Sequence, residues 1–184
     1  MDLHEALSTR RTVHRYRPDP VPDEAIERAL AQAHLAPNHR LTWPWRFVLM
    51  GRGVREQLIP TAVRLKCKDR PPTELLEQKI RNKLLAPPVV IAVSCLRSDD
   101  PLRHQEDLAA VACAIQNLCL SLHADGIASK WGSGAITRAD ESYALLGIDR
   151  SEATIVGFIQ VGYADGTPTT PTRPPLEPLV RRIP

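Results

Sequence analysis

Apolar residues recur at spacings of three and four along most of the chain, which is the pattern of helices with one buried face. In the clearest case Leu108, Val111, Ile115 and Leu118 form one stripe, and Gly126 follows as a terminator. The pattern predicts six helices: Asp2 to Thr9, a segment from near Asp23 to the stop at Pro37, Val54 to Lys68, Thr73 to Leu85, Arg103 to Ala124, and a small helix around Glu141 to Leu146.

Three short apolar segments have the composition of strands: Arg46 to Met50, Pro88 to Leu96 and Ala153 to Tyr163. The second is almost continuously apolar, as in a strand covered on both faces. The segment Ile127 to Ile136 is assigned no element, and its last six residues are interpreted as a glycine-containing turn. Because helices and strands are interspersed without a repeat or a second domain, we expect one α+β domain over residues 1–184 with a central sheet.

Composition and charge exclude several classes of function. The 184 residues carry a net charge of only +3, which does not suggest nucleic acid as the partner. The longest apolar run, Pro87 to Leu96, is too short to span a bilayer, and no secretory signal is visible. The four cysteines form no CxxC pair and the histidines show no metal-ligand spacing. We therefore expect a cytoplasmic protein with free thiols, no metal and no membrane partner.

Candidate chemistry is concentrated in three segments, since the common catalytic and nucleotide-binding motifs are absent. The segment "STRRTVHRY" brings Arg10, Arg11 and Arg15 close together. Three interpretations compete for these arginines: a targeting signal, a nucleic-acid contact, or a pocket for a small phosphorylated ligand. The segment "APNHRLTWPWRF" combines polar and aromatic residues, and "WGSGAI" offers small residues that let a ligand approach the backbone. Each segment alone also has a purely structural interpretation, as core aromatics or as a turn.

Together these segments resemble a known family. Residues 8–50, "STRRTVHRYRPDPVPDEAIERALAQAHLAPNHRLTWPWRFVLM", are similar to the N-terminal third of the nitroreductase family of FMN-dependent oxidoreductases. The similarity continues through "DLAAVACAIQNLCLSLHADGIASKWGSGAI" and "IVGFIQVGYADGTPTTPTRPPLEPLV" in the same order. The spacing best matches the compact branch of NAD(P)H nitroreductases. The resemblance implies a nitroreductase-like α+β fold, with a central, mostly antiparallel sheet flanked by helices and an extended C-terminal arm that crosses to the dimer partner.

The resemblance also implies which residues bind FMN. They are Arg10, Arg11, Thr12, Leu35, His39, Trp43, Trp131, Gly132, Ser133, Gly134 and Arg173. Arginine suits the phosphate because guanidinium is permanently charged and forms paired hydrogen bonds with oxygen. Trp43 departs from the family, which usually has glutamine or asparagine there, so we interpret it as a stacking or shielding group. Arg15 and Arg17 are expected to be solvated surface charges.

The activity implied by the resemblance is hydride transfer from NAD(P)H to FMN N5 and then to a small oxidised acceptor such as a nitroaromatic or a quinone, in ping-pong order. The expected assembly is a homodimer with FMN at the interface. In some relatives the nicotinamide nucleotide contacts a segment matching Ser121, Leu122, His123, Ala124, Asp125 and Gly126. Two alternatives stay open: a flavin storage or sensor protein without reductase activity, and a flavin-fragmenting or dehalogenating enzyme of the same fold.

Overall fold

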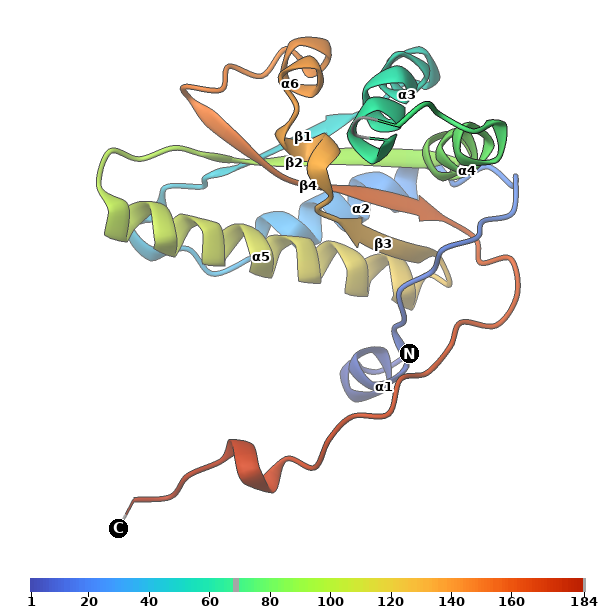
Figure 1. Ribbon diagram of the computed structural model, residues 1–184. Helices are drawn as coiled ribbons and strands as arrows, with labels where there is room; N and C mark the ends of the chain where they lie inside the picture. Colours follow the sequence, from blue (N-terminus) through green and yellow to red (C-terminus); the bar gives the residue numbers. More distant parts are fainter. Residues whose placement is uncertain (68–69, 184) are drawn as a thin grey trace.

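A four-stranded sheet forms the centre of the computed structural model, which describes residues 1–67 and 70–183. The strands are β1 (Trp45–Leu49), β2 (Val89–Leu96), β3 (Ala128–Gly132) and β4 (Ala153–Gly162). They are ordered β1-β2-β4-β3, and every neighbouring pair is antiparallel (Figure 1). The predicted α+β class and antiparallel sheet are therefore confirmed.

Helices cover both faces of this sheet. On one face lie α2 (Asp23–His34) and α5 (Pro101–Ala124), and on the other lie α3 (Arg52–Cys67), α4 (Glu74–Leu85) and α6 (Asp140–Leu146) (Figure 1). The short α1 (Leu3–Thr9) stands apart from these layers and contacts α5. All six predicted helices are confirmed, although the predicted end at Lys68 lies outside the described residues. Three 3₁₀ turns, at His39–Leu41, Ala135–Arg138 and Glu177–Leu179, were not predicted.

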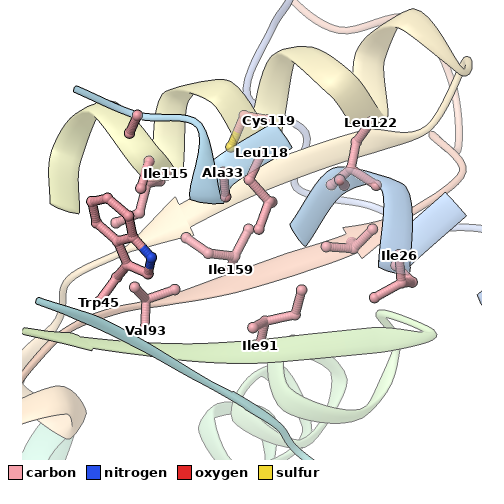
Figure 2. Close-up of a cluster of buried hydrophobic side chains, with 14 of the residues drawn as sticks. Ile26, Ala33, Trp45, Ile91, Val93, Ile115, Leu118, Cys119, Leu122 and Ile159 are labelled. Atoms are coloured by element: carbon pink, nitrogen blue, oxygen red, sulfur yellow. The ribbon is translucent and has the colours of Figure 1, made fainter. Parts of the chain in front are cut away.

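Strand β2 is buried on both faces, as its continuous apolar run predicts. Successive side chains of a strand point to opposite faces, so Ile91 and Val93 join the core under α2 and α5, whereas Val90 and Ala92 join the core under α3, α4 and α6. Figure 2 shows the first core, where Ile91, Val93 and Ile159 of the sheet face the side chains of α5. The two cores together fix the position of both central strands.

Helix α5 begins earlier than predicted because of its cap. The Asp100 side chain accepts hydrogen bonds from the backbone N–H groups of Leu102 and Arg103, and Pro101 occupies the first turn, where its missing N–H does no harm. The helix ends at Ala124, and Gly126 follows with a φ of 74°. Its 24 residues make it about 36 Å long, so it connects opposite ends of the molecule.

The segment Ile127 to Ile136, which was assigned no element, contains a strand that extends into the first two residues of the predicted turn, and this corrects the sequence interpretation. Residues Ala128–Gly132 pair with β4 and form one edge of the sheet, and the turn follows them. The strand is short and includes Ser129 and Lys130, so it lacks the apolar run that identifies β2. The register places Trp131 opposite Ile159 on the α5 face, whereas Lys130 opposes Gln160 on the other face.

The chain after β4 leaves the body of the protein. Apart from the turn at Glu177–Leu179, residues 164–183 contain no helix or strand, and the tail runs past α1 away from the sheet (Figure 1). Its apolar side chains Leu176, Leu179 and Ile183 are exposed. That this arm crosses to a dimer partner stays a prediction, and its last residue, Pro184, lies outside the described residues.

Candidate functional site

The N-terminal arginine segment lies against the edge of the sheet. The Val13 backbone N–H donates to the Ser129 carbonyl of β3 over 3.3 Å, and Thr12 pairs with the same residue in a parallel bridge. A little further on, the Arg17 N–H donates to the Tyr163 carbonyl over 2.9 Å. Residues 10–17 are therefore fixed between β3 and the chain that leaves β4. This arrangement brings the first and third predicted segments, "STRRTVHRY" and "WGSGAI", side by side.

A cleft of about 510 Å³ opens where this segment meets the start of the C-terminal tail. Four predicted site residues line it: Arg10, Arg11, Thr12 and Arg173. His14 and Arg15 also line it, so Arg15, although exposed, contributes to the cleft and is more than the surface charge predicted from sequence. Arg17 fits that prediction, because it is exposed, pairs with Asp19 at 3.2 Å and stacks over the ring of Tyr163.

The cleft is rich in hydrogen-bond donors and poor in negative charge. Within residues 1–67 and 70–183, Arg10, Arg15 and Arg173 form no ion pair with a carboxylate. In the described part of the chain, Asp165 is the one acidic residue that lines the cleft. Arg11 is held by the chain itself, since its guanidinium donates to the Ser8 and Arg10 carbonyl oxygens at 2.7 and 2.9 Å. Such a set of unpaired guanidinium groups suits a phosphate.

A second hollow, of about 190 Å³, meets this cleft at a pair of basic side chains. The Lys130 Nζ lies 3.0 Å from Nδ1 of His14, and Lys130 lines the hollow together with Lys83, Gly132 and Gly134. Among the described residues, no acidic side chain lines it. The Lys130 charge lowers the pKa of His14, with smaller contributions from burial and Lys83. Burial, followed by the charge of Lys83, lowers the pKa of Lys130.

Three residues of this basic cluster, His14, Lys83 and Lys130, were missed by the sequence analysis. His14 stands inside the arginine segment and was visible there. Lys83 belongs to α4 and Lys130 to a strand that was interpreted as part of a connecting segment, so no spacing in the sequence relates them. Only the sheet register and the packing of α4 against it bring the three together.

The predicted turn residues line the space beside β3. A Cβ atom on Gly134 would meet no atom within 4 Å, so the space next to this backbone is open. The Trp131 indole lies across β4 at Gly157, where a Cβ atom would stand 2.1 Å from its Nε1. This nitrogen also donates to the Val156 carbonyl over 3.4 Å, while the side chain stays 43% exposed. Gly157, which was not predicted, therefore makes room for Trp131, and Ser133 stands exposed in the turn.

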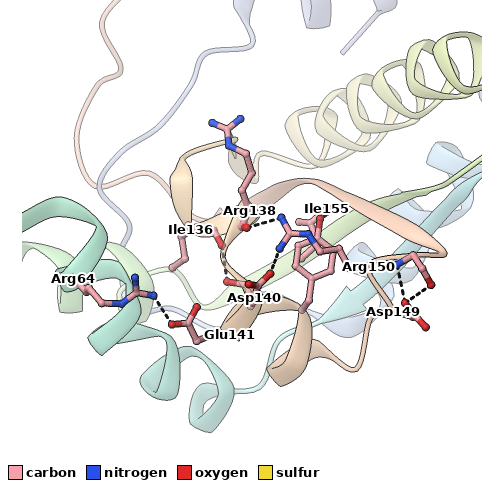
Figure 3. A network of polar contacts seen from close by, with 11 residues as sticks. Arg64, Ile136, Arg138, Asp140, Glu141, Asp149, Arg150 and Ile155 are labelled. Atoms are coloured by element: carbon pink, nitrogen blue, oxygen red, sulfur yellow. Dashed lines mark hydrogen bonds and ion pairs between the residues drawn. The ribbon is translucent and has the colours of Figure 1, made fainter. Parts of the chain in front are cut away.

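A polar network anchors the chain that follows this turn (Figure 3). The Ser142 hydroxyl donates to the Ile136 carbonyl over 2.6 Å, and the Arg150 guanidinium donates to the Arg138 carbonyl over 2.8 Å while it pairs with Asp140. These contacts join the 3₁₀ turn to α6 and to the loop before β4. They fix the backbone on the far side of the turn, so the open space beside it has a rigid wall.

The remaining predicted flavin contacts lie elsewhere. His39 and Trp43 stand exposed on the loop between α2 and β1, and Leu35, which is 70% exposed, lies beside the outer surface of α5. Thr42 of the loop forms a hydrogen bond with Asp107 of α5. Thr9, at the start of the arginine segment, lies within hydrogen-bond distance of His123 of α5. The stretch of α5 between Asp107 and His123 is roughly 24 Å long. One chain alone therefore does not bring this loop to the arginines.

The segment predicted to contact the nicotinamide nucleotide forms the end of α5 and the turn after it. Leu122 is fully buried in the core. His123 Nε2 lies 2.8 Å from the Thr9 hydroxyl, and Asp125 pairs with Arg28 at 2.9 Å. These contacts have structural roles, and nucleotide binding by Ser121 to Gly126 stays a prediction. No group of three or more metal-ligating side chains occurs within the described part of the chain.

The amino-acid sequence and the fold match proteins of one family. A sequence model described as "Nitroreductase family" matches residues 7–163. The protein named "Putative NAD(P)H nitroreductase YfhC" from Bacillus subtilis is 32% identical over 176 residues, which cover 95% of this chain and 90% of that protein. The crystal structure of a nitroreductase-like family protein from Bacillus cereus superposes with a TM-score of 0.84 at 25% identity, over 100% of this chain and 96% of the other.

A further solved structure has the same fold at lower identity. It is the FMN-dependent nitroreductase NfnB from Mycobacterium smegmatis in complex with NADPH, with a TM-score of 0.79 and 22% identity over 98% of this chain and 97% of that one. The family match extends from the arginine segment to the end of β4, so it includes the second hollow and the arginine side of the cleft, whereas the tail side of the cleft, from Asp165 to Arg173, lies beyond it. The chain belongs to the nitroreductase family.

Proposed function

We propose that this protein is an FMN-dependent oxidoreductase that uses NAD(P)H to reduce a small oxidised acceptor. One observation carries the proposal: cationic side chains that form no ion pair within residues 1–67 and 70–183 run from the arginine cleft along β3 to a less polar hollow. A ligand with a phosphate at one end and a flat ring system at the other matches this order of charge and apolar surface. The family membership and the names of its relatives support FMN and NAD(P)H as the molecules concerned.

The residues present fit FMN at both ends. Arg10, Arg15 and Arg173 would hold the phosphate, because their guanidinium groups have no carboxylate partner among the described residues. Thr12 adds a hydroxyl group to the same cleft. The ring system would be held at the edge of β3, where Gly134 leaves open space and the backbone N–H groups of the turn are available.

The basic cluster would act on the electronic state of the bound cofactor. FMN, when bound, supplies hydride transfer, from NAD(P)H to its N5 and from there to an acceptor such as a nitroaromatic or a quinone, in ping-pong order. The ammonium groups of Lys83 and Lys130 favour negative charge in the hollow that they line. His14 accepts a hydrogen bond from Lys130 at Nδ1 when its ring is neutral, the form that its lowered pKa favours.

A homodimer would complete the site. His39 and Trp43 stand far from the arginines of their own chain, so in this proposal they reach the cofactor of the partner. Helix α5 offers a surface for such an assembly: by length and composition it is apolar enough to cross a membrane, yet only 44% of its apolar window is buried. In a core helix the buried part faces the sheet, and the remainder, which includes the exposed Cys113, would pack against a second copy. A cytoplasmic location also stays a prediction.

Subunit complementation tests the shared site. We expect Arg10→Ala and Trp43→Ala homodimers each to lose most FMN-dependent activity. In a mixed dimer one site carries both substitutions and the other carries neither, so random exchange of subunits restores about a quarter of the wild-type sites. Recovery of activity after the two variants are unfolded together and refolded is the expected result. No recovery, with mixed dimers verified by mass spectrometry, would contradict the shared site.

The experiment that tests the function is an absorbance spectrum followed by anaerobic addition of NADPH and then NADH. We expect bound flavin that bleaches with at least one of the two nucleotides and regains its colour when a quinone is added. A flavin that stays oxidised with both nucleotides would favour the storage or sensor alternative. A colourless protein that FMN does not reconstitute would refute the assignment of the arginine cleft and the β3 turn.

A further inference from the structure

The loop that carries His39 and Trp43 is under backbone strain. Arg40, Leu41 and Trp43 have φ angles of 60°, 53° and 40°, and they are the only non-glycine residues with positive φ in the described ranges. Side chains with a Cβ rarely adopt this conformation, and bulky leucine and tryptophan adopt it least readily. Such strain persists only where neighbouring contacts hold it, and it is common at functional sites. The contacts that hold this loop therefore show what its conformation depends on.

A directed chain of hydrogen bonds holds the loop to α5. The Trp43 backbone N–H donates to Asn38 Oδ1 over 2.6 Å, and Asn38 Nδ2 donates to the Thr42 hydroxyl over 3.0 Å. The Thr42 hydroxyl lies 2.5 Å from Asp107 Oδ1. A hydroxyl has one proton, so Thr42 donates it to the charged carboxylate and accepts from the asparagine. Every bond in the chain then points toward Asp107.

Asp107 is an unusual end point for this chain. Its side chain is only 4% exposed, and none of the ion pairs within the described residues includes it. Thr42 provides the one side-chain hydrogen bond to its carboxylate found in the same residues. The buried Cys95 feels its charge: burial, with a smaller effect of the Asp107 carboxylate, raises the pKa of that thiol to about 12. A buried carboxylate with so few partners destabilises the fold, so it needs a reason other than stability.

We propose that Asp107 is a positioning residue for the flavin site of the partner subunit. Through Thr42 and Asn38 it holds the strained loop in the one conformation that directs His39 and Trp43 outward together. Its anchor is α5, the longest helix of the protein, which also carries the surface for the second copy, so the loop and the dimer contact share one rigid support. This inference rests on the proposed function, because it assigns the loop to a cofactor bound by the other chain.

The test uses Thr42→Val, which keeps the shape and removes the proton donor, and Asp107→Asn, which keeps the shape and removes the charge. Thr73→Val is the matched control, because it removes the same hydroxyl from a threonine that caps α4, where it accepts a hydrogen bond from the Leu76 N–H over 3.3 Å in a different part of the fold. Thr42→Ser is the conservative variant that restores the hydroxyl. The readouts are backbone hydrogen exchange of residues 38–43, the dissociation constant of FMN, and the melting temperature.

We expect Thr42→Val and Asp107→Asn to speed exchange in residues 38–43 and to weaken FMN binding by about tenfold, the size of a lost hydrogen bond to a charged group. Thr42→Ser should behave as wild type, and Thr73→Val should lower the melting temperature, through the lost helix cap, without either effect. Unchanged exchange in the loop would overturn the positioning role, as would faster exchange with unchanged FMN affinity. A wild-type protein that binds no FMN would refute the proposed function, a different result from any of these.

Discussion

The arginine segment and the loop from Asn38 to Trp43 are two irregular parts of one chain, yet they are held in opposite ways. Backbone hydrogen bonds to Ser129 and Tyr163 fix the arginine segment at the sheet, and among the described residues its Arg10 and Arg15 side chains have no carboxylate partner. Side-chain hydrogen bonds fix the loop, so its backbone is strained and its imidazole and indole groups are exposed. The first region offers charge for an anion, and the second offers flat surfaces for a ring. Neither is a complete site, which is why we infer that two chains share one.

The largest expected effect comes from removing charge in the first region. Arg10→Ala should weaken FMN binding by roughly 10- to 100-fold, because a hydrogen bond to a charged group contributes about 1.5–3 kcal/mol. Titration of flavin fluorescence measures this effect. Arg52→Ala is the control, since Arg52 is an exposed arginine on α3 that pairs with Glu56 and lies outside the cleft. Equal losses in the two variants would mean that net charge, and not the cleft, determines affinity.

A smaller effect should follow from crowding the Trp131 side chain where it lies across β4. In Gly157→Ala the new methyl group would overlap the Trp131 indole, which must move, so we expect a loss of about 1–3 kcal/mol in unfolding free energy. The tryptophan emission spectrum should shift at the same time. Gly53→Ala in α3 is the matched control, because a Cβ there meets nothing within 4 Å and alanine favours the helix by about 0.5–1 kcal/mol. A Gly157→Ala protein as stable as wild type, with unchanged emission, would contradict the packing of Trp131.

The smallest effect concerns the proton on His14. Lys130→Met should raise the pKa of His14 toward its ordinary value of 6.5, and Lys83→Met should raise it less. In wild type the unfolded chain binds this proton at a higher pH than the folded chain does, so stability falls as the pH falls through 6.5. That slope should flatten in Lys130→Met. Nuclear magnetic resonance titration of the imidazole measures the pKa, and an equal shift in both variants would contradict the ranking of the two lysines.

Local patterns were enough to predict the helices and the central strands. The apolar stripe of α5 and the continuous run of β2 identify their elements without any partner. Strand β3 was missed because its identity depends on pairing with β4, and its own residues alternate only weakly. The capping side chain of Asp100 also moved the start of α5 to Pro101.

The difference between what local patterns predict and what depends on distant contacts also applies to the site. The arginines of the N-terminal segment were predicted because they are neighbours in the sequence and match a family pattern. Lys83 and Lys130 come from different elements, and Asp107 acts on the loop from a helix far along the chain. These residues become related only through the register of the sheet and the packing of helices, neither of which a single sequence displays. Contacts between distant segments are therefore what the structure adds.

The order of the strands has a consequence for how the protein is made. Strand β3 leaves the ribosome before β4, but its one partner in the sheet is β4, and the arginine segment in turn pairs with β3. The arginine segment, which is synthesised before both strands, must therefore wait, unpaired, until β4 has emerged. A nascent chain that stops before Ala153 has its arginines but no wall to place them against. The cofactor site proposed above therefore forms only once β4 is complete, so an unfinished chain lacks it.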